Sequence, residues 1–207
     1  MNSFIRMKYR IILIILFIGI LSLTCLYTLK DLFYNENLPS EEEFSICPLS
    51  DGFDFPVGKP NAKKYYDAQS FGVNDHLGED WNGKGGGNTD LNDPVFSVSD
   101  GVVFWAKDRG GKWGNIVRIL HKVDNSNYPQ YIESFYAHLE KILVKKGDIV
   151  KRGTQIGTIG NVGGIYFAHL HLEFRNKLGM EIGGGYSSIQ EGYISPTQFI
   201  KAHRPKK

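Results

Sequence analysis

The chain has 207 residues, of which 22% are charged and 13% are aromatic, and its formal net charge is +2. This length suits one well-buried domain with appendages and is too short for two large domains. Four basic residues and no acid lie in the first thirty positions, so the remainder of the chain is nearly neutral. Nucleic-acid binding needs a basic stripe, and the even charge balance excludes that class.

Residues 11–29 form a nearly unbroken apolar run behind a basic flank at residues 1–10. A helix over this run would span about 28 Å, close to the hydrocarbon thickness of a bilayer. The basic flank predicts that the N-terminus stays in the cytoplasm and that the rest is exported. Because no clear small-residue cleavage site follows, an uncleaved anchor is favoured over a signal peptide. Cys25 leaves a third possibility open, which is lipid attachment after cleavage.

Residues 30–52 are polar and acidic, and we expect a linker there, followed by one domain at residues 53–203. Short apolar segments bounded by turns then predict strands, and they favour an all-β antiparallel fold of sandwich or barrel type. The expected strands are 95–99, 102–106, 116–120, 131–136 and 169–174. The one helix expected in the domain is Pro196 to Ala202, with Ser195 as its N-cap.

Three glycine-rich segments interrupt these elements, at residues 83–88, 160–164 and 183–185. Glycine runs of this kind do not form regular structure, and they favour loops. Since they lie beside or beyond the histidine motifs, they suggest an open groove for an extended substrate.

His169 and His171 are separated by one residue on an expected strand, so both side chains leave from the same face. One imidazole can then bind a metal while the other lies beside a metal-bound water. Leu170 and Leu172 would point to the opposite face, toward the core. A strand with this alternation is therefore a candidate edge of a metal site.

His76 and Asp80 lie four residues apart with Gly78 between them, a spacing that favours a loop around a bound ion. Together with the His-x-His pair they supply imidazole and carboxylate ligands. A catalytic zinc site needs three such ligands and keeps one position open for water.

Tyr136-Ala-His138-Leu139 contributes a further histidine near the end of an expected strand. Beside a metal site, the His138 imidazole could orient the water, take its proton or stabilise an oxyanion. His121 is interpreted as a structural histidine, and His203 is assigned no function. We expect core positions, not substrate contacts, for the aromatic residues Trp81, Trp105, Trp113 and Tyr136. Trp81, directly after Asp80, is the first candidate for an exception.

Several motifs occur in an order that resembles the lysostaphin/LytM-type zinc metalloendopeptidases, which cut peptidoglycan peptides. The likeness covers about residues 72–175 and the ending that starts at Ser195. The motifs are H-x-G-x-D at 76–80, Asp100-Gly-Val-Val, Trp113-Gly-Asn-Ile-Val, Tyr136-Ala-His-Leu, Lys146-Gly-Asp-Ile-Val-Lys-Arg-Gly153, Ile156-Gly and His169-Leu-His-Leu-Glu-Phe.

The resemblance implies that His76, Asp80 and His171 bind one Zn²⁺ and that His138 and His169 are the catalytic histidines. It also implies a small antiparallel β fold with a narrow groove. Many relatives carry a Ser/Thr-Gly-Pro stretch before the His-x-His pair, whereas this chain has the bulkier residues 164–168. We expect that difference to affect substrate preference.

The leading hypothesis is a membrane-anchored zinc endopeptidase that acts outside the cytoplasm. It would hydrolyse peptide bonds in the stems or cross-bridges of peptidoglycan. A second hypothesis is a non-catalytic module that binds the wall and regulates other hydrolases, and a regulatory protein partner is left open. The stretch 144–153 also resembles the hairpin of biotinyl or lipoyl carriers. The lysine turn that such a carrier needs is missing from the sequence.

Overall fold

The computed structural model describes residues 35–124 and 131–205. Within them no helix is long and apolar enough to cross a membrane. The apolar run at 11–29, which we expect to be a membrane segment, lies outside the described residues, as do the basic flank and Cys25.

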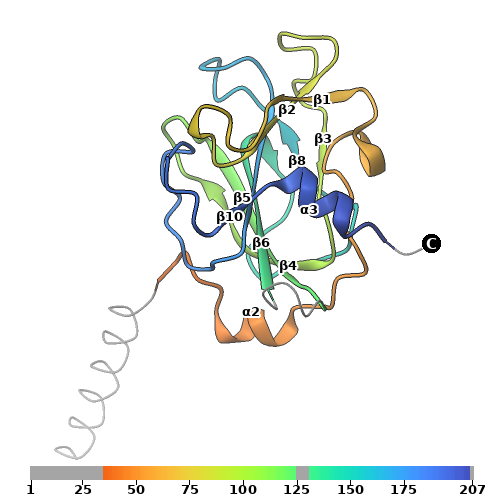
Figure 1. Ribbon diagram of the computed structural model, residues 1–207, viewed down its shortest axis with the longest axis vertical. Coiled ribbons are helices and arrows are strands. Elements are labelled where there is room, and N and C mark those ends of the chain that lie inside the picture. The colour runs from red at the N-terminus through yellow and green to blue at the C-terminus, as the bar shows by residue number, and fades with distance from the viewer. Residues whose placement is uncertain (1–34, 125–130, 206–207) are drawn as a thin grey trace, which may run out of the picture. The chain divides into compact units, whose positions relative to one another are not determined.

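The described part of the chain is dominated by antiparallel strands, which confirms the all-β prediction (Figure 1). The strands are β1 (Tyr65–Gln69), β2 (Glu79–Gly83), β3 (Pro94–Phe96), β4 (Gly101–Asp108), β5 (Asn115–Lys122), β6 (Tyr131–Ile142), β7 (Ile149–Val150), β8 (Gln155–Ile159), β9 (Leu170–Arg175) and β10 (Tyr193–Ile194). Two short helical turns, Gly58–Ala62 and Val73–Asp75, and the helices α2 (Glu41–Ile46) and α3 (Pro196–Ala202) complete the described elements.

The ten described strands join into one branched sheet in the order β1-β2-β9-β6-β5-β4-β7. β10 pairs with β9, while β8 pairs with both β6 and β3. The branch is possible because β6 is twelve residues long and shifts register near Leu139, so its two halves reach different partners. Strands β2, β9 and β6 thereby become neighbours at the middle of the sheet, although 91 residues separate Asp80 from His171.

Each face of this central sheet packs a cluster of buried side chains. One face, which we call the apolar face, carries residues such as Val117, Tyr136 and Leu172. The other carries a smaller apolar cluster that includes Phe135 and Ala137. Because Ala137 pairs directly with His171, and Phe135 with Glu173, the same face carries those polar residues, and we call it the polar face.

Helix α3 begins and ends where the sequence predicts. The Ser195 hydroxyl accepts a hydrogen bond from the Gln198 backbone at 3.3 Å, and Pro196 occupies the first turn. Phe199 and Ile200 are buried against the apolar face. The helix therefore covers that face, and it lies in front of the strands in Figure 1.

The segment before the domain differs from the linker that we expect at residues 30–52. From residue 37 onward it belongs to the same compact unit as the strands, and it contains α2. Ser40 and Glu43 form a reciprocal capping box, and Cys47 is buried with the smaller apolar cluster. The acidic residues that suggest a solvated linker instead occupy the first turn of a capped helix, where the helix dipole favours them.

Candidate functional site

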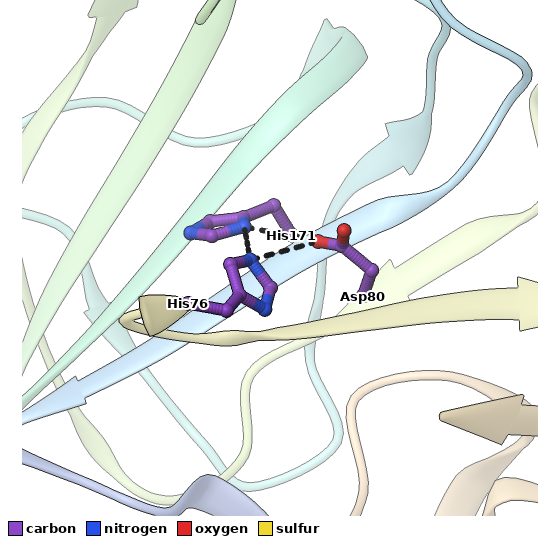
Figure 2. Close-up of side chains that lie close together, drawn as sticks. All are labelled: His76, Asp80 and His171. Carbon is purple, nitrogen blue, oxygen red and sulfur yellow. Dashed lines mark hydrogen bonds and ion pairs between the residues drawn. The ribbon is translucent and has the colours of Figure 1, made fainter. Parts of the chain in front are cut away.

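Three side chains from β9, β2 and the turn before β2 converge on one point, as Figure 2 shows. His171 Nδ1 lies 3.0 Å from Asp80 Oδ1 and 3.1 Å from His76 Nε2. The remaining edge, from His76 Nε2 to Asp80 Oδ1, measures 3.5 Å. The structure therefore brings together all three residues that the sequence proposes as metal ligands.

Strand pairing places Asp80 and His171 opposite each other. Asp80 lies on β2 and pairs directly with His171 on β9. The prediction that both ligands lie in a loop is therefore correct for His76 and wrong for Asp80. Gly78 permits this close approach of the two strands. A Cβ at that position would lie 2.5 Å from the Leu172 carbonyl oxygen and 2.9 Å from His171 Cε1, closer than real Cβ atoms come.

The ring of His76 is oriented by its own backbone surroundings. Its Nδ1 lies 3.2 Å from the Gln69 carbonyl oxygen, which can only accept a hydrogen bond. The proton therefore resides on Nδ1, and the Nε2 lone pair faces Asp80 and His171. Tyr186 covers the ring, with the two ring centres 5.0 Å apart.

His171 is held from both sides. Its Nε2 lies 3.0 Å from Glu173 Oε1, while Nδ1 faces Asp80. Although burial opposes protonation, the hydrogen bonds to Asp80 and Glu173 raise the pKa of His171 to about 9. Burial also opposes ionisation of Asp80, but the hydrogen bond from His171 lowers the pKa of its carboxyl group. The triad thus brings one carboxylate and two imidazole nitrogens to a single point, where a bound metal ion would replace the proton between His171 and Asp80.

His138 belongs to β6 but does not follow the alternation of that strand. Ala137 faces His171, so regular alternation would send the His138 side chain to the apolar face. Instead His138 has φ of +60°, next to a register shift, and its ring lies 5.7 Å from that of His171. A bulge of this kind re-aims a side chain, here toward the site.

His138 and His169 present equivalent nitrogen atoms to the site. The Nδ1 of His138 lies 3.2 Å from the Trp113 carbonyl oxygen, and the Nδ1 of His169 lies 2.8 Å from that of Phe167. Both carbonyls can only accept, so each ring carries its lone pair on Nε2, and that of His169 lies 3.8 Å from Asp80 Oδ1. Burial first, and then the proximity of His171 and His169, lower the pKa of His138 to about 3, so its ring is neutral at pH 7.

A cavity of about 360 Å³ opens above these groups. Trp113 stacks on His138 with ring centres 5.7 Å apart, and its indole N–H donates to the Gly183 carbonyl at 3.0 Å. Tyr166 lies beside His138 and His169, at ring distances of 5.1 and 5.7 Å. The cleft therefore has aromatic walls around a histidine-rich floor. Other residues that line it are Gln69, Lys112, Gly184, Gly185 and Tyr186.

The donor set and its dimensions fit a divalent metal ion. Two imidazole nitrogens and one carboxylate oxygen are ligands that zinc prefers. Ligand atoms about 2.0–2.1 Å from a tetrahedral ion lie about 3.3 Å apart, and the edges of the triad are 3.0, 3.1 and 3.5 Å. His76, Asp80 and His171 would hold the metal and leave a side of it open to the cleft.

Two expectations about the other aromatic and histidine residues can be compared with the structure. His121 is fully buried and bonded at both ring nitrogens, to the Asp100 carbonyl at 2.8 Å and to Ser134 Oγ at 2.7 Å, which confirms a structural role. Trp81 is buried in the core beside Phe55, as expected for most of the aromatic residues, and is not the exception; the tryptophan that lines the cleft is Trp113. Trp81 lies within β2, on the face opposite Asp80.

Sequence reasoning missed Trp113 and Glu173 as members of this site. The signal for Trp113 is its context, Gly110-Gly-Lys-Trp-Gly114, a tight loop that could not form a core strand. The signal for Glu173 is its spacing two residues after His171, on the same face of the strand.

The chain matches the model of one protein family over residues 75–183, about half its length, and that family is "Peptidase family M23". The match contains all the residues placed in the metal triad and both additional histidines. The chain therefore belongs to peptidase family M23.

Curated relatives of this chain include a protein named as an endopeptidase and one named as a hydrolase activator. Peptidoglycan DD-endopeptidase ShyB from Vibrio cholerae is 41% identical over 85 residues, which are 41% of this chain and 18% of ShyB. Murein hydrolase activator NlpD from Escherichia coli is 34% identical over 83 residues, 40% of this chain and 20% of NlpD. The chain thus matches about a fifth of the length of these relatives.

Among solved structures, the antimicrobial peptidase lysostaphin from Staphylococcus simulans is similar in fold. The two share 24% sequence identity with a TM-score of 0.50, over 67% of this chain and 50% of lysostaphin. This likeness agrees with the antiparallel β architecture described above.

Proposed function

We propose that this chain is a zinc-dependent endopeptidase that hydrolyses peptide bonds in peptidoglycan stems or cross-bridges. The observation that carries the proposal is the convergence of the metal triad with two free imidazole nitrogens, those of His138 and His169, in one cleft. Membership in a peptidase family and the similarity to a peptidoglycan DD-endopeptidase support the choice of reaction and substrate.

Zn²⁺ bound by the triad would supply a Lewis acid that polarises a carbonyl group and brings the pKa of water to about 7. His138 and His169 perform the acid–base work in this proposal. Each is fixed in orientation by a backbone carbonyl that accepts from Nδ1, so its Nε2 can take a proton from the attacking water. The same imidazole can then donate that proton to the leaving amine.

The aromatic walls position the substrate. Trp113 fixes the plane of the His138 ring by stacking, and Tyr166 and Tyr186 flank the floor from two sides. An extended peptide backbone laid in the cleft would meet ring faces and a few polar groups, which suits a flexible and polar substrate. Orientation of this kind contributes to the rate by holding the scissile carbonyl close to the reacting groups.

The test compares the full chain in detergent with its His171→Ala and His138→Gln variants on purified walls of several cross-link chemistries, with fragments read by mass spectrometry. We expect zinc-dependent fragments from at least one wall, lost in His171→Ala and strongly reduced in His138→Gln. Turnover that survives strong chelation would contradict the zinc mechanism. The wall that is cut would also identify the bond.

A second candidate function is that of a wall-binding regulator of other hydrolases. The similarity of 83 residues of this chain to a murein hydrolase activator is the observation that favours it. Tight binding to walls and stoichiometric zinc, without cleavage of any wall by the unaltered chain, would support this second function and exclude the first.

We also propose that the domain acts outside the cytoplasm, anchored through residues 11–29. The support is the length and apolar character of that run and its basic flank. Protease added to intact spheroplasts should digest the domain and spare a cytoplasmic control protein. Protection of the domain in intact spheroplasts, followed by digestion after lysis, would contradict the proposed orientation.

A further inference from the structure

Three of the four histidines at the site are oriented by the main chain. His76, His138 and His169 each point Nδ1 at a backbone carbonyl, those of Gln69, Trp113 and Phe167. His171 differs, because its Nε2 bonds to a side chain, that of Glu173, and its Nδ1 faces the metal triad. His171 is therefore the one ring of these four whose orientation a single side-chain substitution can release.

Glu173 is itself fixed by a row of buried charges along the polar face. Its Oε2 accepts hydrogen bonds from Arg175 at 2.6 and 2.8 Å. Arg175 lies 3.7 Å from Glu133 Oε1, and Glu133 receives two hydrogen bonds from Arg118, at 2.7 and 3.0 Å. The row therefore runs from His171 across β9, β6 and β5, and all four of its members have 0% exposed surface.

The outer end of the row is closed by Asn37 and by the segment after β9. Arg118 donates to the Asn37 side chain at 2.8 Å. Both arginines also donate to main-chain carbonyls of residues 180–182, at 3.2 to 3.4 Å. Each member of the row therefore has partners within the protein, and Glu173 is held at both carboxylate oxygens, by His171 and by Arg175.

Stability alone does not explain this arrangement. Four charges removed from water are expensive, and apolar side chains of similar volume often replace a buried ion pair without loss of stability. Several positions on the apolar face of the same strands are occupied by apolar residues, as at Val117, Leu172 and Phe174. What the row does supply is a carboxylate of fixed position, 3.0 Å from the distal nitrogen of a metal ligand.

We propose that Glu173 is a positioning residue for the metal site: it holds the proton of His171 on Nε2 and thereby directs the Nδ1 lone pair at the metal, while Arg175, Glu133 and Arg118 keep Glu173 in place. Carboxylates that accept a hydrogen bond from a metal-bound imidazole have this effect in general, and their removal costs about 10–100-fold in metal affinity. The proposal rests on the zinc site proposed above.

The test measures zinc affinity and the His171 tautomer in the full chain in detergent, so it does not depend on hydrolysis. Zinc affinity is measured by competition with a chromophoric chelator. The tautomer is read from long-range ¹H–¹⁵N correlations of the zinc-loaded, ¹⁵N-histidine-labelled chain. We expect Glu173→Ala to lower zinc affinity about 10–100-fold and to remove the hydrogen-bonded Nε2–H signal of His171. Glu173→Gln keeps an acceptor oxygen, so it should retain part of the zinc affinity and part of the Nε2–H signal.

Asp100→Asn provides the matched control, because Asp100 is another buried carboxylate, paired with Lys151 at 3.1 Å, and does not line the cleft. Its zinc affinity should stay within about twofold of the unaltered chain, even where its unfolding temperature falls. If Glu173→Ala does not fold, Glu133→Gln tests the same row one step further away and should still weaken zinc binding.

Unchanged affinity and an unchanged Nε2–H signal in the folded Glu173 variants would overturn the positioning role. An unaltered chain that binds no zinc would overturn both this inference and the proposed zinc site. A chain that binds zinc and cuts no wall would contradict only the proposed activity.

Discussion

The two faces of strand β9 are built from alternating residues and have opposite characters. Leu170, Leu172 and Phe174 point to the apolar face and are fully buried among other apolar side chains. His171, Glu173 and Arg175 occupy the intervening positions and form part of the metal triad and the charge row. One strand of six residues thus separates the burial that stabilises the fold from the groups that perform chemistry.

The apolar face also contains a polar network, and the comparison with the site shows what distinguishes the two. There His121 bonds to the Asp100 carbonyl and to Ser134, Ser134 bonds to Tyr136 at 3.0 Å, and Tyr136 accepts from the Val98 backbone at 3.0 Å. Both ring nitrogens of His121 are used within the protein. At the site, His138 and His169 each leave one ring nitrogen directed at the cleft. A buried histidine with an unused nitrogen is therefore the better candidate for function.

The sharpest test of this division is to truncate neighbouring residues on β9. His171→Ala should abolish zinc binding and reduce hydrolysis by about 1000-fold or more, since it removes a ligand of the metal that polarises the substrate. Leu172→Ala should lower the free energy of unfolding by about 2–5 kcal/mol, because it leaves a cavity in the core.

Urea unfolding and zinc titration of both variants, at a temperature where both are folded, separate these effects. Loss of zinc binding by folded Leu172→Ala to the same extent as by His171→Ala would show that the two faces are not independent.

A second prediction concerns the pH dependence that His121 gives to the apolar face. Burial lowers the pKa of His121 to about 4, while an unfolded histidine titrates near about 6.5. Between these values the unfolded chain binds the extra proton, so stability falls as the pH drops from about 6.5 to about 4 and then levels off. The loss from this one group is about 3 kcal/mol over that window.

The measurement is the free energy of unfolding from pH 7 to pH 4 for the unaltered chain and for His121→Gln. The carboxylates contribute equally to both chains, so the difference in slope reports His121. Parallel pH curves for the two chains would show that His121 is protonated in the fold or accessible to water.

Much of this architecture follows from local patterns in the sequence. Alternating apolar residues predict β4, β5, the first half of β6 and β9, and the cap at Ser195 predicts α3. The His-x-His spacing correctly places Leu170 and Leu172 on the core side of the strand. These predictions hold because successive side chains of a strand point to opposite faces, so the position of a residue along the strand decides its direction.

Features that depend on contacts between distant segments could not be predicted in the same way. The acidic residues of α2 predict a linker when they are considered alone. A helix of six residues is stable only through packing, here of Cys47 and its neighbours, and the local sequence does not reveal that packing. The direction of the His138 side chain depends on a positive φ within β6, which interrupts the alternation of side chains along the strand. Trp113 rather than Trp81 reaches the cleft because a glycine loop, and not a strand, carries it.

A third prediction tests how closely β2 must approach β9. Gly78→Ala would place a methyl group against the Leu172 carbonyl and the side chains of His171 and Glu173. We expect the strands to separate locally, with a loss of about 1–3 kcal/mol in stability. Zinc affinity should fall at least about tenfold, because Asp80 moves away from His171.

Gly184→Ala is the control, because a Cβ there meets nothing within 4 Å although Gly184 lines the same cleft. Calorimetric zinc titration of both variants should show weak binding for the first and nearly unaltered binding for the second. Equal affinities would mean that β9 can shift without disturbing the triad.

The smallest expected effect concerns the exposed apolar side chain of Phe167 in the segment before β9. Phe167 is 72% exposed, although its carbonyl anchors His169 and its neighbour Tyr166 lines the cleft. Phe167→Ser keeps that carbonyl, so zinc affinity and stability should change little, by less than about 0.5 kcal/mol in stability. If the ring contacts the bound peptide, KM should rise about two- to tenfold with kcat unchanged, as expected when binding is lost equally from the ground and transition states.

Ile189 is equally exposed at 72%, does not line the cleft among the described residues, and serves as the matched position for Ile189→Ser. Steady-state kinetics on a soluble wall peptide should distinguish the two variants through KM. A fall in kcat for Phe167→Ser would instead indicate that the side chain, and not only the carbonyl, keeps His169 in place. Specificity and catalysis would then be coupled within residues 164–168, the stretch that we expect to affect substrate preference.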